Sequence, residues 1–149
     1  MTTTLILSYL ISLSTTTALL VYGLDLPSLM TGQNKLVTEY YYKKYIDSFM
    51  LDVFLVAGYL GIASYVSVAI GYTGVYARAA IVSLTAALLS SLFYAMFLSG
   101  FQKGSFFQRW FKAAGFSAVL YDVVFVTAVF VGLETLDRII LSRLHDYID

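Results

Sequence analysis

The sequence predicts an all-α integral membrane protein, a bundle of four transmembrane helices with an interfacial segment and an amphipathic C-terminal helical tail. Hydrophobic residues make up 60% of the 149 residues, and charged residues only 12%. Soluble domains have about 45–50% apolar and about 25% charged residues. In addition, four apolar runs each approach the ~20 residues that cross a bilayer core as a helix. We therefore expect a single membrane domain, residues 1–149, whose first partner is the lipid bilayer.

Charge and cysteine content exclude several function classes. The formal net charge is zero, with nine basic and nine acidic residues. Nucleic-acid binding needs a clustered basic excess, so no nucleic-acid partner is expected. The chain has no cysteine and one histidine, which excludes disulfides, thiolate chemistry and histidine-cluster metal sites. Nucleophile elbows, metal-ligand sets and Gly-rich phosphate loops are missing. We expect no catalytic residue, no cofactor and no metal, and hence no enzyme.

The first apolar run covers residues 5–22. No lysine or arginine precedes it, so it lacks the charged start of a secretory signal and is interpreted as a retained transmembrane helix. Thr4, Ser8, Ser12 and Thr15 share one helical stripe. These hydroxyls would bond back to their own helix or across to a neighbouring one. A polar pore lining is the alternative interpretation.

Two segments, residues 35–48 and 101–112, combine aromatic with basic side chains and are called the collars below. The first carries Tyr41, Lys43, Lys44 and Tyr45, and the second carries Arg109, Trp110 and Lys112. Amphipathic rings and long amines both suit the headgroup layer of a membrane. We therefore interpret these residues as interfacial anchors. Contact with a polar partner is the alternative for the tyrosine–lysine cluster.

The second and third spans, residues 49–71 and 77–99, each have a stripe of small residues. Such stripes let transmembrane helices approach closely, so we expect a closely packed antiparallel hairpin. The stripe residues are Ala57, Gly61, Ser64 and Gly71 on the second span, and Ala79, Ser83, Ala86, Ala87 and Ser90 on the third.

The fourth span covers residues 113–132, and a helical tail follows at 133–149. Gly132 does not end the helical pattern, because apolar residues keep a helical period as far as Tyr147. Glu134 and Arg138 stand four residues apart, an arrangement that supports a helix. The tail is expected to lie on the membrane or on a partner helix.

Four spans place both chain termini on one side of the membrane. That side holds three arginines, whereas the collar side holds six basic residues. Because positive residues favour the cytoplasmic side, the collars are expected to be cytoplasmic. The basic residues are Arg78, Arg138 and Arg143 on the terminal side, and Lys35, Lys43, Lys44, Lys103, Arg109 and Lys112 on the collar side.

Two aspartates, Asp52 and Asp122, lie inside apolar spans. By helical rise Asp52 lies about 12 Å beyond Lys44 and Asp122 about 15 Å beyond Lys112, so the two should reach similar depths. An aspartate in mid-bilayer costs about 2.5–3.5 kcal/mol on insertion scales. The structural interpretation gives each a hydroxyl partner on a neighbouring span, such as Ser90 or Tyr94. The alternative is a proton or cation relay.

The string FFQRWFKAAGFSAVLYDVV, which begins at Phe106, is preceded by YYYKKY at Tyr40 and by an Asp-Val pair at Asp52. Together these segments resemble small multi-span membrane proteins of large double-stranded DNA viruses, over spans two to four. The resemblance implies a protein of the internal virion membrane that links this membrane to the capsid shell. It implies no catalytic residue. Small accessory subunits of large eukaryotic membrane complexes have a similar overall sequence pattern.

The expected function is therefore structural. We expect an integral membrane protein that anchors or organises a larger complex, such as a viral capsid on its internal membrane. Partners would be other membrane or shell proteins, or a second copy of the chain. A small channel or a proton- or cation-coupled transporter that uses Asp52 and Asp122 is the alternative, as is an accessory subunit of a eukaryotic complex.

Overall fold

The computed structural model describes residues 2–145, which form helices without a strand among them. Four of these helices are long and apolar enough to span a membrane, at Thr4–Gly23, Tyr45–Ala69, Val75–Leu98 and Phe116–Ile140. The predicted class, an all-α fold with four membrane-spanning helices, is confirmed. In chain order the elements are α1 (Thr2–Thr16), η1 (Thr17–Gly23), α2 (Leu26–Thr31), α3 (Asn34–Val37), η2 (Thr38–Lys43), α4 (Tyr45–Ala69), α5 (Val75–Leu98), α6 (Phe106–Ala114) and α7 (Phe116–His145).

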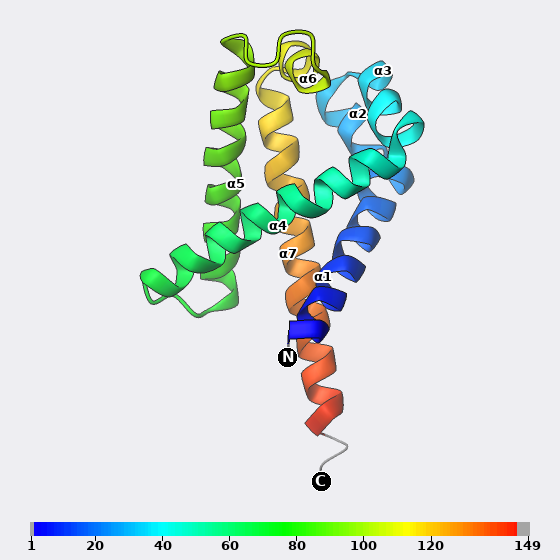
Figure 1. The fold of residues 1–149 in the computed structure, drawn as a ribbon. Helices are drawn as coiled ribbons and strands as arrows, with labels where there is room; N and C mark the ends of the chain where they lie inside the picture. The colour runs from blue at the N-terminus through cyan, green and yellow to red at the C-terminus, as the bar shows by residue number, and fades with distance from the viewer. Residues whose placement is uncertain (1, 146–149) are drawn as a thin grey trace.

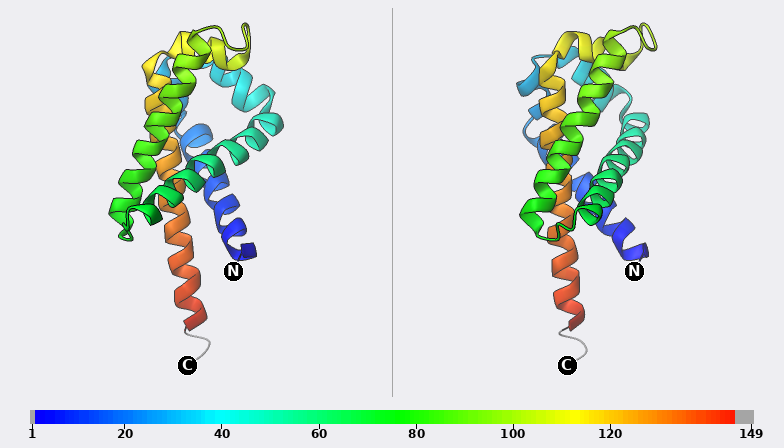
Figure 2. Two further views of the ribbon diagram at one scale, coloured as in Figure 1. Left: turned by 60° about the vertical axis from the view of Figure 1, so that its left-hand side comes forward. Right: turned by 90° about the vertical axis from the view of Figure 1, so that its left-hand side faces the viewer.

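Helix α7 runs through the middle of the bundle and packs on both α1 and α5 (Figures 1 and 2). Against α1, the Ser12 hydroxyl donates to the Val129 carbonyl at 2.7 Å. Gly132 permits this approach, since a Cβ atom there would overlap the Ser12 hydroxyl. Against α5, the hydroxyls of Ser83 and Thr127 lie 2.8 Å apart. Small residues and hydroxyls thus join α7 to its neighbours, as is common between helices in lipid.

The hydroxyl stripe predicted on the first span is divided. Ser8 and Ser12 are buried, whereas Thr4 and Thr15 are exposed. Ser12 bonds across to α7, which fits the packing interpretation of this stripe rather than a continuous polar lining.

Helix α4 forms the predicted antiparallel hairpin with α5 but is inclined to α5 and α7 (Figure 1). Its small-residue stripe does not pack, because Ala57, Gly61 and Ser64 are all exposed and nothing lies within 4 Å of a Cβ added at Gly61. The small face of α5 meets α7 instead, through Ser83 and Ser90. The prediction that the two stripes pack on each other within this hairpin is therefore wrong, because the α4 stripe is exposed and the α5 face packs on α7. Helix α4 buries a neighbouring stripe, namely Val56, Tyr59, Leu60, Ala63 and Ser67.

The short elements α2, α3, η2 and α6 gather at one end of the bundle, and the start of α1 and the end of α7 lie toward the other (Figure 1). We call this group, with the loop before α6, the cap. Ser105 begins α6 by accepting a hydrogen bond from the Gln108 backbone N–H. Gly115 separates α6 from α7. Its backbone has a φ of 60° and a ψ of −143°, a combination that residues other than glycine rarely adopt. This break is why the fourth span begins at Phe116 and not at residue 113.

At the opposite end, Arg78 of α5 pairs with Glu134 of α7 at 2.8 Å and lies over the Phe130 ring. The sequence paired Glu134 with Arg138 instead, a contact within one helix. Glu134 pairs with Arg78 and not with Arg138 because the start of α5 lies beside this part of α7. Helix α7 continues through Gly132 to His145 without interruption. The last predicted tail residues, including Tyr147, lie outside the described range.

Candidate functional site

A cavity of about 170 Å³ lies where α4, α5 and α7 meet the cap. Both intramembrane aspartates line it. The rest of its wall is apolar and largely aromatic, with rings from η2, α5, α6 and α7. The structure therefore brings Asp52 and Asp122 to one place, from two helices that share few other contacts.

Asp52 is 9% exposed and reaches the cavity from α4. Its Oδ1 atom accepts a hydrogen bond of 2.9 Å from the Tyr40 hydroxyl. Tyr40 belongs to η2, so the cap itself supplies this partner. The other carboxyl oxygen, Oδ2, is buried and has no hydrogen-bond partner among the described residues. Buried polar atoms are nearly always bonded, and among the described residues this oxygen and the Ser8 hydroxyl are the two exceptions.

Asp122 reaches the cavity from α7 and is held within the bundle. Its Oδ2 atom accepts a hydrogen bond of 2.5 Å from the Ser90 hydroxyl on α5. Ser90 is fully buried. Ser90 is among the partners that the sequence suggested for the aspartates, and it bonds to Asp122.

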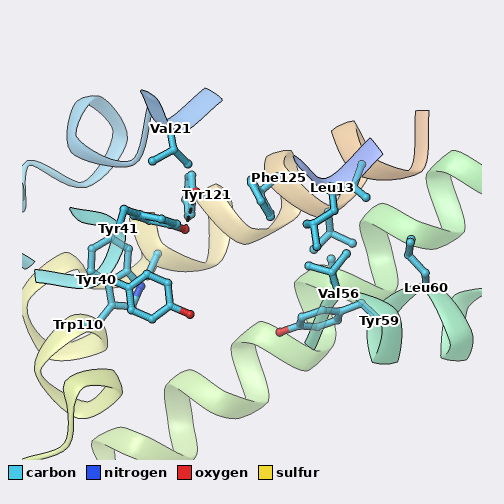
Figure 3. Packing of buried hydrophobic residues seen from close by; sticks show 14 of the residues in the cluster. Leu13, Val21, Tyr40, Tyr41, Val56, Tyr59, Leu60, Trp110, Tyr121 and Phe125 are labelled. Atoms are coloured by element: carbon cyan, nitrogen blue, oxygen red, sulfur yellow. Dashed lines mark hydrogen bonds between the residues drawn. The ribbon is translucent and has the colours of Figure 1, made fainter. Parts of the chain in front are cut away.

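Aromatic side chains from both collars close the cavity on the cap side. Tyr40 stacks on Phe106 with ring centroids 4.8 Å apart, and Phe106 stacks on Trp110. The hydroxyls of Tyr41 and Tyr121 lie 2.8 Å apart, which joins η2 to α7. Figure 3 shows Tyr40, Tyr41, Trp110 and Tyr121 gathered at this end of the core. Burial raises the pKa of Tyr40 and of Tyr41, so both keep their O–H at neutral pH.

An ion pair joins the two collars on the outside of the cap. The Arg109 guanidinium donates to both carboxylate oxygens of Glu39, at 2.9 and 2.5 Å. These hydrogen bonds lower the pKa of Glu39 and raise that of Arg109. Just outside the two collars, the Gln33 side chain donates to the Ala113 carbonyl at 3.2 Å.

The predicted interfacial anchors fall into two groups. Lys43, Lys44, Tyr45, Arg109 and Lys112 are exposed, as headgroup contact requires. Tyr41 and Trp110 are buried, at 8% and 7% exposure. These two rings hold the cap on the bundle and do not face outward.

Sequence reasoning missed Gln108, which is buried in α6. Its side-chain amide donates to the Phe97 carbonyl at the end of α5, and its carbonyl accepts from the Gly104 N–H at 2.7 Å. The spacing Ser105-x-x-Gln108 is that of a helix-start capping motif and would have identified it. Glu39 and Tyr121 were also missed, because their partners lie 70 and 80 residues away along the chain.

The cavity chemistry consists of two carboxyls, four tyrosine hydroxyls and apolar walls. Within residues 2–145, no group of three or more His, Cys, Asp or Glu side chains could hold a metal ion. Comparison with protein-family models, with curated proteins and with solved structures found no match to this chain.

Proposed function

We propose that this protein is a non-enzymatic membrane anchor that organises a larger assembly by binding a partner at its cap. The observation that carries the proposal is that two collars about 70 residues apart fold into one unit with its charged side chains outward. All five lysines of the chain belong to this end and are exposed. They are Lys35, Lys43, Lys44, Lys103 and Lys112.

The chemistry of the cap favours an acidic partner surface next to the membrane. Lysine amines are strongly hydrated point charges that suit exposed ionic contacts, and anionic headgroups attract the same residues. The resemblance to membrane proteins of large double-stranded DNA viruses makes a capsid shell protein our preferred partner, with the chain in the internal virion membrane. The lysine excess favours a cytoplasmic cap.

Lysine cross-linking with mass spectrometry, in the native membrane or particle, tests this proposal. We expect abundant cross-links from the five lysines to one acidic partner. Changing Lys43, Lys44 and Lys112 together to glutamine should release that partner, whereas Arg138→Gln at the opposite end should retain it. Cross-links only between copies of this chain, or equal retention by both variants, would contradict the proposal.

A small proton or cation conductor is the second candidate, because Asp52 and Asp122 line the same cavity. The double variant Asp52→Asn, Asp122→Asn separates the candidates in proteoliposomes that report ion flux. A conductor should lose flux while its helical content persists. An anchor should show no flux in either form and should still assemble with its partner.

A further inference from the structure

The cavity below the cap contains an unmet hydrogen-bond acceptor. Asp52 is 9% exposed, lines the cavity, and its Oδ2 atom has no partner among the described residues. Its other oxygen is already bonded to Tyr40. An unsatisfied buried acceptor costs about 1–3 kcal/mol, and a donor placed in the cavity would remove that cost. The site is therefore built to receive an N–H or O–H group.

The surroundings favour a positively charged donor. A second carboxyl, Asp122, lines the same cavity, and no lysine, arginine or histidine is among the residues of its wall. Two carboxyls in apolar surroundings strongly favour a cation between them. Aromatic faces add to this preference, because an ammonium group is attracted to the face of a ring. Tyr40, Tyr59 and Trp110 are among the aromatic residues that line the cavity.

The apolar walls of the cavity favour an organic cation over an inorganic one. Calcium requires six to eight oxygen ligands, and magnesium near-octahedral oxygen geometry, which two carboxyls do not provide. A cavity of about 150 Å³ with apolar walls can hold a benzene molecule. The present cavity, at about 170 Å³, has room for one ring or a short alkyl body with an amino group.

We propose that this cavity binds a small organic amine, with its ammonium group between Asp52 and Asp122 and its apolar body against the aromatic wall. The ammonium donates to Asp52 Oδ2. Leu51, which lines the cavity and is 36% exposed, marks the entry side. This binding function is independent of the anchoring function proposed above.

The fluorescence of Trp110 tests the proposal directly, since Trp110 is the only tryptophan of the chain and lines the cavity. The probe is 4-bromophenethylamine, whose bromine quenches tryptophan emission, added to the full chain in a neutral detergent. Saturable quenching is expected. The uncharged analogue 4-bromophenethyl alcohol should need at least a tenfold higher concentration, a comparison that uses only the unchanged protein.

Variants then assign the ammonium to its carboxyl partner. Asp52→Asn should weaken amine binding at least tenfold while leaving the response to the alcohol unchanged. Asp47→Asn is the matched control, because Asp47 is exposed and lies on the same helix outside the cavity. Equal quenching by amine and alcohol, or equal amine affinity in Asp52→Asn and Asp47→Asn, would overturn the proposal.

The amine could come from solution, or it could be the head of a long-chain amine whose chain stays in the bilayer outside the cavity. Displacement of the bromo-amine by sphingosine in nanodiscs, at a low mole fraction, would identify the lipid source. Displacement by 2-phenylethylamine but not by sphingosine would identify a soluble amine. Failure of both to displace a saturable signal would overturn the assignment to amines.

Discussion

Helices α7 and α4 are both apolar spans with an aspartate in the cavity wall, yet they are held in different ways. Helix α7 lies at the centre, joined to α1 and α5 by small residues and hydroxyl hydrogen bonds. Helix α4 leans away, with its small-residue stripe exposed. A stripe of small residues therefore permits close helix packing but does not determine that the stripe is packed. A polar partner on the facing helix decides which stripe packs.

The two aspartates repeat this difference. Asp122 is bonded to Ser90, which belongs to a neighbouring span. Asp52 is bonded to Tyr40, which belongs to the cap. The environment of Asp122 therefore depends on the bundle, and that of Asp52 depends on the docking of the cap.

The largest difference is expected from one substitution made on each helix. Gly132→Ala places a methyl group onto the Ser12 hydroxyl, and overpacking of this kind costs about 1–3 kcal/mol. Gly61→Ala meets nothing within 4 Å and should be neutral or stabilising by up to about 1 kcal/mol, through helix propensity. Thermal unfolding in a neutral detergent measures both. Equal midpoints for the two variants would mean that α1 does not lie against α7 as described.

A smaller effect should distinguish the partners of the two aspartates. Tyr40→Phe and Ser90→Ala each remove one hydrogen bond to a buried carboxyl, which costs about 1–3 kcal/mol. Only Tyr40→Phe should also loosen the cap and shift the emission of buried Trp110 to longer wavelength. Tyr42→Phe, at an exposed neighbouring ring, is the control and should change neither property. A shift of the Trp110 emission to longer wavelength in Ser90→Ala but not in Tyr40→Phe would mean that Ser90, and not Tyr40, stabilises the docking of the cap.

The smallest effect is expected at the exposed ion pair of the cap. Folded Glu39 has a pKa below the usual 4.5, so the pair stabilises the folded state above about pH 4.5. This contribution is lost as the pH falls through the lowered pKa of Glu39. Glu39→Gln should therefore lower the unfolding midpoint slightly at pH 7 and less at pH 3, with high salt reducing the effect. An equal decrease at both pH values would contradict the pairing with Arg109.

Local composition was enough to predict much of the fold. The apolar runs predicted four spans because a bilayer core fixes the length of a crossing helix. The collar sequences placed Asp52 and Asp122 at comparable distances from the same end, and both line one cavity. These features depend on residues close together in the chain.

Features that depend on distant partners were not predictable. Glu134 had a suitable partner four residues away, and only the position of α5 shows that Arg78 binds it. The sequence predicted only that Gly132 does not end the helix. The structure shows that its lack of a side chain leaves room for the Ser12 hydroxyl. Tyr41 and Trp110 have the residue types of headgroup anchors, but both are buried. Tyr41 contacts Tyr121, 80 residues away along the chain, and the Trp110 ring packs against Phe106 and Tyr121.

Cross-linking of introduced cysteines tests the central claim, that two distant collars form one cap. The chain has no cysteine of its own, so each introduced pair is unique. Glu39→Cys with Arg109→Cys, treated in membranes with a short bismaleimide, should cross-link within one chain. Glu39→Cys with Tyr76→Cys, where Tyr76 is exposed at the start of α5 near the opposite end, should not. Cross-linking of the second pair, or of neither, would contradict a cap built from both collars.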